Sequence, residues 1–256
     1  MSAYSSAVLA DAPRHYYRFS DPGGQIARDI GSSPLTLHAG FYLAQLGYTG
    51  PVSDGGSAFF TDLGVLWYPH PDLAYAAPLT LECWFYQHFD NGAEMKIVST
   101  ENAVTYQGLG IGFAVGRKPE CFGFGTAVVA AAAVPLNTWT HIVARHNGAS
   151  KDLLVNGVLV GSALQAFANG NGPFVVGAQY PNRTLYIEGM VSEVAVYGSA
   201  LPTARCLAHY NAADQISAFP VYRPNGTQDA GTGAPTFSSD DIAAIYRAVH
   251  HTFPTT

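Results

Sequence analysis

Charged residues are scarce in this sequence: Asp, Glu, Lys and Arg make up 12% of its 256 residues, against about 25% in an average globular protein. Coiled coils and long helical repeats depend on Glu, Lys and Arg, so the deficit excludes both classes. Hydrophobic residues amount to 48%, which excludes an intrinsically disordered chain. What remains is a folded globular protein.

Basic residues are few and scattered, and the formal net charge is −6. A protein that binds nucleic acid neutralises phosphates with clustered Lys and Arg. The three lysines and nine arginines form no such cluster along the chain. We therefore expect no nucleic-acid partner.

Cysteines and long apolar runs are also rare. The three cysteines are an odd number with no close pair, which argues against a disulfide framework and against a zinc site. No apolar run approaches the length of about eighteen residues that a membrane span needs. The first residues lack the basic start and apolar core of a secretion signal, so we expect synthesis in the cytoplasm and no membrane partner.

Turn residues and strand-forming residues are abundant. Asn-Gly pairs, which favour tight hairpin turns, begin at residues 91, 147, 156, 169, 171 and 225. Runs typical of strands occupy residues 79–86, 109–115, 138–145, 152–155, 158–162, 174–177 and 190–197. In the run 79–86, apolar residues share one face, and Glu82, Trp84 and Tyr86 share the other. Short antiparallel strands with few helices between them predict an all-β sandwich.

Two helices are expected near the end of the chain. The first covers about residues 202–213, because Pro202 suits an early helical position. The second covers about residues 239–250, where a serine can cap the helix and apolar residues repeat at helical spacing. We predict a β-sandwich domain over residues 1–215 and a C-terminal extended arm with an amphipathic helix over 216–256.

Several segments together are similar to a known family. They are the short helix-like stretch 8–13 with the strand 15–19, the turn 27–31, the aromatic strand 56–60, the Glu-x-Trp strand 79–86, the Trp-x-His hairpin 139–160, the strand 189–197 and the helix ending at Tyr210. They resemble the laminin-G-like or concanavalin A-like jelly roll, in particular the form found in bacteriophage structural proteins. The resemblance covers about residues 4–213 and implies a jelly-roll β-sandwich.

Glycoside hydrolases of this fold carry paired carboxylates on one face, about 5–5.5 Å apart in retaining enzymes. Here Glu82 is alone on its strand, and Glu188 and Glu193 are five positions apart, which would point them to opposite faces. His141 is interpreted as a packed or hydrogen-bonded structural residue. We therefore expect no catalytic residues and no enzymatic activity.

Several members of the fold bind calcium in rim loops through Asp side chains. Asp29, Asp54 and Asp62 are the candidate ligands here. A loop aspartate more often bonds its own backbone, so calcium is the weaker interpretation and no other cofactor is expected.

Sugar binding would need exposed aromatic side chains. Trp84 and Tyr86 on the strand 79–86, and Trp67 and Tyr68 in a Pro-containing loop, are the candidates.

Glycines at 108, 110 and 112 leave one face of the strand 109–115 bare, which allows the backbone to be approached closely.

The resemblance favours a non-enzymatic structural protein in the virion of a tailed bacteriophage, as a capsid decoration or surface appendage that contacts other virion proteins and forms a homo-oligomer. A low charge content suits surface covered by neighbours, because charged residues are depleted in interface cores. The arm would dock through the apolar residues Phe219, Ile242, Ile245, Tyr246 and Val249. The alternatives are a carbohydrate-binding receptor or adhesin module for host-surface glycans and, third, a polysaccharide hydrolase.

Overall fold

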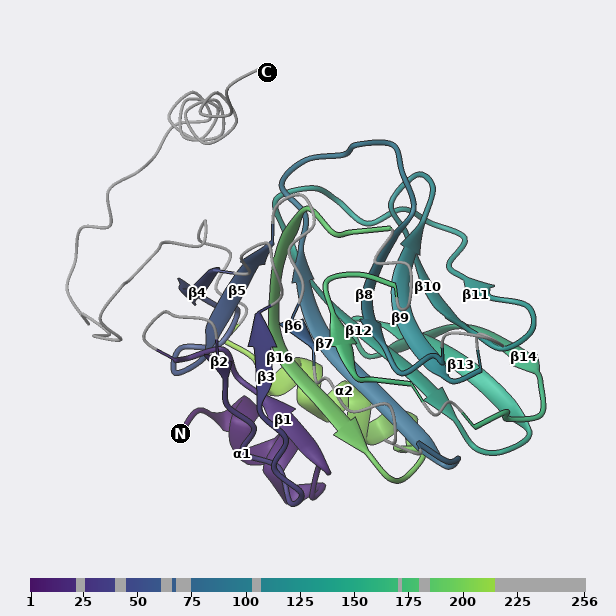
Figure 1. Ribbon diagram of the computed structural model, residues 1–256, viewed down its shortest axis with the longest axis horizontal. Helices are drawn as coiled ribbons and strands as arrows, with labels where there is room; N and C mark the ends of the chain where they lie inside the picture. The colour runs from purple at the N-terminus through teal and green to yellow at the C-terminus, as the bar shows by residue number, and fades with distance from the viewer. Residues whose placement is uncertain are drawn as a thin grey trace. The chain divides into compact units, whose positions relative to one another are not determined.

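The computed structural model describes residues 1–21, 26–39, 45–60, 66–67, 75–102, 107–169, 172–179 and 185–214. These residues belong to one compact unit, Met1–Gly226, and Figure 1 shows their helices and strands. The elements in chain order are α1 (Ala3–Ala10), β1 (His15–Tyr17), β2 (Ile26–Ala27), β3 (Leu37–Ala39), β4 (Gln45–Thr49), β5 (Gly56–Phe60), β6 (Leu66–Trp67), β7 (Leu79–Tyr86), β8 (Met95–Ser99), β9 (Leu109–Ala114), β10 (Lys118–Gly123), β11 (Val128–Val129), β12 (Trp139–His146), β13 (Ser150–Val155), β14 (Val158–Leu164), β15 (Val175–Val176), β16 (Gly189–Tyr197) and α2 (Thr203–Ala212).

The strands form two antiparallel sheets. Sheet A has the order β14-β13-β12-β7-β16-β5-β4, with β1 also paired to β16, and sheet B has the order β11-β10-β9-β8-β15-β6-β3-β2. Strands adjacent in space are often distant in sequence, such as β7 and β16, which pair from Thr80–Tyr197 to Tyr86–Met190. The prediction of an all-β sandwich is confirmed.

Two apolar layers hold the domain together. The first lies between the sheets and includes Leu81 and Phe85 from β7 and Ile111 from β9. The second lies on the outer face of sheet A, beneath α1 and α2, and includes Trp84 and Tyr4. Each large apolar side chain that is fully buried contributes about 1.5–3 kcal/mol, so both layers stabilise the fold. The alternation predicted for 79–86 therefore separates two cores, because both faces of β7 are buried.

The hairpin β13–β14 follows from its turn residues. Asn156 has a φ of +50° and Gly157 a φ of +76°, the pair of positive values that a type I′ turn requires and that Asn-Gly supplies. The side chain of Asn156 also accepts a 2.9 Å hydrogen bond from the backbone N–H of His141. The turn is thereby tied to the neighbouring strand β12.

The helices differ a little from expectation. α2 lies within the predicted range, with Pro202 as its N-cap residue. The helix-like stretch expected at 8–13 begins earlier, at Ala3, because the Ser2 side chain caps it by accepting from the N–H of Ser5. No described helix is long and apolar enough to cross a membrane. The domain boundary at residue 215 and the helix predicted at 239–250 lie outside the described residues.

Candidate functional site

Glu82 of β7 is the centre of a buried polar network between sheet A and the helices. The hydroxyls of Tyr4 and Tyr197 each donate a 2.8 Å hydrogen bond to its carboxylate. Nε2 of His141 lies 2.8 Å from one carboxylate oxygen, and Nδ1 of His209 lies 3.0 Å from the other. These partners come from α1, β16, β12 and α2, so one carboxylate joins both helices to the sheet.

The charges in this network stabilise one another. Burial alone would raise the pKa of Glu82, but His209 and His141 outweigh burial and hold that pKa well below its usual value. Burial alone would lower the pKa of His209, but Glu82 and Asp11 raise it. Oδ2 of Asp11 lies 2.9 Å from Nε2 of His209. Glu82 and His209 therefore form a pair in which a carboxylate faces an imidazolium.

Sequence reasoning placed Glu82 alone on its strand because its partners are far away in the chain. His141 was expected to be structural, and its side chain is fully buried against Glu82. The sequence shows Glu82 and Trp84 on one strand and the Trp-x-His motif on another. Only the pairing of β7 with β12 shows that His141 lies opposite Trp84 and close to Glu82.

A second buried carboxylate, Glu193, lies on the neighbouring strand β16. The hydroxyl of Tyr16 donates to it, and Nε of Arg18 lies 3.4 Å from its Oε1. Burial raises the pKa of Glu193 to about 7, although Arg18 and Tyr16 oppose the rise. Glu193 has a φ of +51° where the pairing with β7 shifts register. The expectation of regular alternation from Glu188 to Glu193 was wrong, because a β-bulge interrupts it.

Neither buried carboxylate is placed for hydrolysis. A general acid or nucleophile must touch its substrate, whereas Glu82 and Glu193 are both 0% exposed. As placed, the two side chains hold the helices, β1 and β16 together.

The two strand aromatics predicted for sugar stacking are buried, at 1% exposure for Trp84 and 2% for Tyr86. The ring of Tyr210 from α2 stacks on Trp84 with centroids 5.8 Å apart. The Tyr86 ring packs against Trp139, with centroids 5.4 Å apart. A stacked sugar needs an open ring face, so this prediction is corrected: both rings are core residues.

The described calcium candidates act as loop residues. The Asp29 carboxylate accepts from the backbone N–H groups of Tyr16, Gly31 and Leu35 at 2.7–2.8 Å. Asp54 accepts from Ser2 and Arg18, and these bonds outweigh burial and lower its pKa to about 2. Within the described ranges, no three His, Cys, Asp or Glu side chains are grouped to hold a metal ion.

Other predicted site residues lie outside what the structure describes. For position 67 only the backbone is described, in β6, where Trp67 pairs with Val175 of β15. Asp62, Tyr68 and the whole arm fall outside the described residues, the arm including Phe219, Ile242, Ile245, Tyr246 and Val249. These assignments stay predictions.

The outer face of sheet B is the better candidate for ligand binding. The described helices both pack on sheet A, so neither covers this face. Across β8, β9 and β10 one row of pairs joins Ser99, Gly110 and Phe122, and another joins Lys96, Gly112 and Glu120. The row between them belongs to the core, so these two rows face outward.

The bare strand face predicted from the glycines is confirmed, and the structure shows what occupies it. A Cβ on Gly110 would lie 2.1 Å from Cζ of Phe122. A Cβ on Gly112 would lie 2.6 Å from the carbonyl oxygen of Met95 and 3.0 Å from both the Glu120 carboxylate and the Lys96 side chain. The two glycines therefore let an aromatic ring and an ion pair lie flat against the sheet.

Lys96 forms the polar centre of this face. Its ammonium bonds to the carboxylates of Glu120 and Glu94 and lies 4.3 Å from the centroid of the Phe122 ring. Burial raises the pKa of Glu120 in spite of the lysine. Lys96 and Glu120 are 5% and 4% exposed, whereas Glu94 is 40% exposed. The ion pair is therefore almost buried, and Glu94 is the member of this group that reaches solvent.

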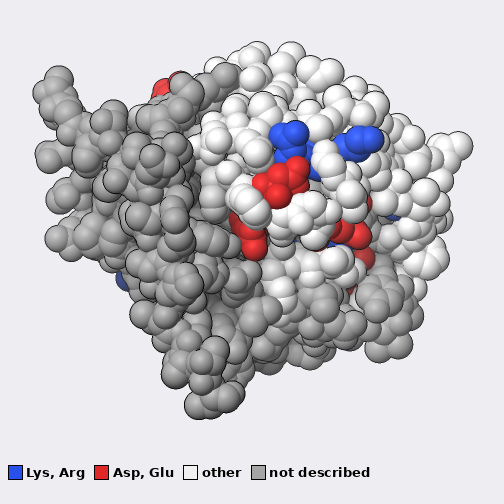
Figure 2. Space-filling view, turned by 90° about the horizontal axis from the view of Figure 1, so that it is seen from above, with Lys and Arg blue, Asp and Glu red and all other residues white. Residues whose placement is uncertain are grey.

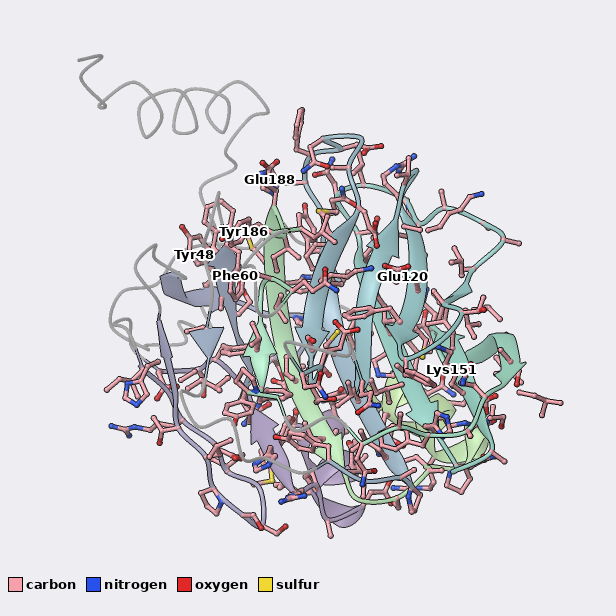
Figure 3. All side chains as sticks on the ribbon, turned by 45° about the vertical axis from the view of Figure 1, so that its right-hand side comes forward. Tyr48, Phe60, Glu120, Lys151, Tyr186 and Glu188 are labelled. Atoms are coloured by element: carbon pink, nitrogen blue, oxygen red, sulfur yellow. The ribbon has the colours of Figure 1, made fainter. Side chains whose placement is uncertain are left out.

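Two half-buried residues extend this group. The backbone N–H of Lys96 donates a 2.8 Å bond to the carbonyl of Leu185, and the adjacent Tyr186 packs on Val175 and Ala178. Gln179 donates a 3.0 Å bond to Glu101, a carboxyl whose pKa burial raises to about 7. Figure 3 labels Glu120 and Tyr186 within this arrangement.

We call this set the sheet-B surface: Lys96, Glu120, Phe122, Gln179 and Tyr186. It extends from β10 to β15, three strand spacings or roughly 14 Å. Ammonium and amide donors, carboxylate acceptors and aromatic rings lie together on it. Such a combination suits a polar, hydroxyl-rich ligand with apolar faces.

Comparison with known families identifies the fold. The profile of the concanavalin A-like lectin/glucanases superfamily (Laminin_G_3) matches residues 61–205, more than half of the chain. The chain belongs to this superfamily. The predicted resemblance to a laminin-G-like, concanavalin-like jelly roll is thereby confirmed. None of the curated proteins matches the sequence.

Solved structures of the same fold include three informative neighbours. A Trypanosoma rangeli sialidase in complex with sialic acid has a TM-score of 0.57 at 12% identity, over 77% of this chain and 32% of the sialidase. Domain 4 of AbnA, an extracellular arabinanase of Geobacillus stearothermophilus, in complex with arabinotriose, has a TM-score of 0.59 at 14% identity, over 77% of this chain and 98% of that domain. The receptor-binding domain of botulinum neurotoxin type G has a TM-score of 0.56 at 12% identity, over 78% of this chain and 51% of that domain. This member of the superfamily spans about a third of the sialidase.

For this concanavalin A-like domain, the sequence indicated the glycines beneath the sheet-B surface but not the polar and aromatic side chains that lie on it. Lys96, Glu120 and Phe122 lie on three strand segments whose pairing is not visible in the sequence. The available signal was the outward alternation of Lys118, Glu120 and Phe122 beside the bare glycine strand.

Proposed function

We propose that this concanavalin A-like domain is a non-enzymatic module that binds a glycan on the sheet-B surface. The observation that carries the proposal is the ion pair Lys96–Glu120, held on a glycine floor beside Phe122. Sugar hydroxyls can donate to the carboxylate of Glu94, which is 40% exposed and bonds to Lys96, and bonds to charged groups contribute about 1.5–3 kcal/mol each. The apolar face of a sugar ring can rest on Tyr186, which is half-buried.

A glycan array followed by calorimetric titration tests this function, with arabino-oligosaccharides and sialylated oligosaccharides as the first probes. The double variant Lys96→Met/Glu120→Gln removes both buried charges and leaves only the more exposed Glu94 without its lysine. We expect it to weaken binding at least tenfold, from the loss of about 1.5 kcal/mol or more. The matched control is Asp152→Asn, which removes a carboxylate of the Arg145–Asp152 pair on sheet A and should leave affinity unchanged. No saccharide binding at millimolar concentration would contradict the proposal.

The absence of enzymatic activity belongs to the same proposal. It is supported by the full burial of Glu82 and Glu193. Release of reducing sugar from bacterial polysaccharides by the purified protein would overturn it.

A second candidate function is assembly into the virion of a tailed bacteriophage, as a capsid decoration or surface appendage protein. It is favoured by the 12% charge content and by the described part of the surface in Figure 2, where a few acidic and basic groups lie among mostly uncharged residues. Mass spectrometry and imaging of purified particles would test it. Hundreds of copies indicate the head and dozens the tail, whereas absence of the protein from particles contradicts this role.

The segment 216–256 enters this second function as an assembly arm. Truncation after residue 215 is expected to leave the sandwich folded and to reduce the amount of protein on particles. Full occupancy by the truncated protein would contradict a role for the arm.

A further inference from the structure

The sheet-B surface has an excess of acidic groups at the place where it reaches solvent. The ammonium of Lys96 is shared by two carboxylates, those of Glu120 and Glu94. Lys96 and Glu120 are almost buried, whereas Glu94 is 40% exposed. The group of three therefore has one carboxylate more than it has ammonium groups, and the charge that a ligand meets first is negative.

Glu94 lies close to the part of the surface that offers an aromatic ring. It bonds to the Lys96 side chain, and it comes just before β8 in the chain. The backbone N–H of Lys96 donates to the carbonyl of Leu185, the residue before Tyr186. A sugar ring that rests on Tyr186 is therefore within reach of the Glu94 carboxylate.

The other basic groups of this region do not offset Glu94. Lys118 lies on the same face of β10 as Glu120, but β10 is two strands away from β8, roughly 9–10 Å. The Debye length is about 8 Å at physiological ionic strength, so solvent ions screen Lys118 from a ligand beside β8. The neighbouring Arg117 is paired with Asp90 and adds no net charge.

A further carboxyl group lies at the other end of β8. Glu101 accepts a 3.0 Å hydrogen bond from the side-chain amide of Gln179. Burial raises the pKa of Glu101 to about 7, so about half of this group is ionised at neutral pH. It adds negative charge beside Gln179, on the same side of the surface as Tyr186.

We propose that the sheet-B surface selects uncharged saccharides over acidic ones, and that Glu94 is the residue that determines this specificity. The inference rests on the glycan binding proposed for this surface. A neutral sugar donates a hydroxyl hydrogen to the Glu94 carboxylate. An ionised sugar carboxylate, such as that of a sialic acid, has no hydrogen to donate and places a second negative charge beside the first.

Lys96 does not serve as the partner of an acidic sugar, because its ammonium is buried and already bonds to two carboxylates. Binding proteins often distinguish two ligands by repelling the wrong one as well as by contacts to the right one. At this surface Glu94 supplies both terms, since one carboxylate accepts from a hydroxyl group and repels an anion.

The test is a glycan array in which each neutral oligosaccharide stands beside its acidic form, followed by calorimetric titration of the pairs that bind. Lactose with sialyl-lactose, and arabinotriose with its glucuronylated form, are the first pairs. We expect the acidic member to bind on the order of tenfold more weakly, the effect of two like charges roughly 5 Å apart near a protein surface. Sodium chloride at about 0.5 M should reduce this difference, because it screens exposed charges, whereas a steric exclusion would not respond to salt.

The variant Glu94→Gln isolates the charge. Its amide oxygen still accepts from a sugar hydroxyl, and Lys96 stays paired with Glu120. We expect the affinities for the neutral and the acidic member to come within roughly twofold of each other. The matched control is Asp152→Asn, which removes one carboxylate charge from sheet A and should keep the full difference.

The outcomes separate this inference from the function on which it rests. Equal or tighter binding of the acidic members by the wild type would overturn the selectivity and leave glycan binding in place. A Glu94→Gln variant that keeps the full preference would overturn the role of Glu94. Binding to neither member of any pair would contradict glycan binding itself, and the selectivity with it.

Discussion

Replacement of Glu82 by Gln tests whether the buried network holds the helices on sheet A. The amide keeps the shape of the side chain but removes the charge that faces His209 and His141. Removing one partner from a buried ion pair lowers stability by about 3–5 kcal/mol, a large share of the 5–15 kcal/mol of a typical domain. At about 2–4 °C per kcal/mol for a domain of this size, the melting temperature should fall by about 6–20 °C.

Urea denaturation monitored by tryptophan fluorescence measures the effect, since Trp84 lies 5.0 Å from His141 between ring centroids. Asp90→Asn is the control, because the side chains of its ion pair with Arg117 are 34% and 29% exposed and the pair should contribute at most about 1 kcal/mol. A loss below about 1 kcal/mol in Glu82→Gln would refute the idea that this carboxylate anchors the helices.

The same network predicts a direction for the pH dependence. The pKa of His209 is raised in the folded protein, so its contribution is fully present below about pH 6.5 and is lost as pH rises through the raised value. The stability difference between wild type and Glu82→Gln should therefore shrink from about pH 6 to about pH 9. A difference that grows over this range would contradict the assigned charges.

Three further outcomes follow from burial and packing. Gly110→Ala should lower the free energy of unfolding by about 1–3 kcal/mol, because the new methyl group displaces Phe122, whereas Gly198→Ala, with open space around it, should be nearly neutral; equal effects in urea denaturation would contradict the packing. The pKa of Glu193 is raised from 4.5 to about 7 in the folded protein, so the folded protein binds this proton more tightly than the unfolded chain does. The stability of the wild type should therefore fall as pH rises from 4.5 to about 7. In pH-dependent melting, Glu193→Gln should lack this slope. Ellman's reagent should label no thiol of the native protein and all three after denaturation, because burial raises the pKa of each cysteine and shields it; fast labelling of the native protein would contradict this.

Much of the fold could be predicted because it depends on local patterns. Alternation in 79–86 and the Asn156-Gly157 turn are encoded within a few residues, and the strands β7, β13 and β14 follow from them. The two layers could not be separated from the sequence, because an apolar face looks the same whether a sheet or a helix covers it. Trp84 was a candidate for an exposed sugar-stacking ring for this reason, although Tyr210 of α2 covers it.

The polar sites were less predictable because they depend on pairing between distant segments. Glu82 meets residues 78 positions before it and 127 after it in sequence. The bulge at Glu193 changes the face of the sheet on which this side chain lies, and no short sequence motif predicts the bulge. Lys96 and Glu120 likewise meet only because β8, β9 and β10 lie side by side.

The placement of α1 and α2 has a consequence for synthesis on the ribosome. Glu82 is made early, but its imidazolium partner His209 is on the last described helix, as is Arg205, which bonds to Asp11 just beyond α1. β1 must also wait, because its partner strand is β16. The nascent chain therefore carries the unpaired glutamate and the first strand without its β16 partner until β16 and α2 have been made, so the closure of this domain comes late in the order of synthesis.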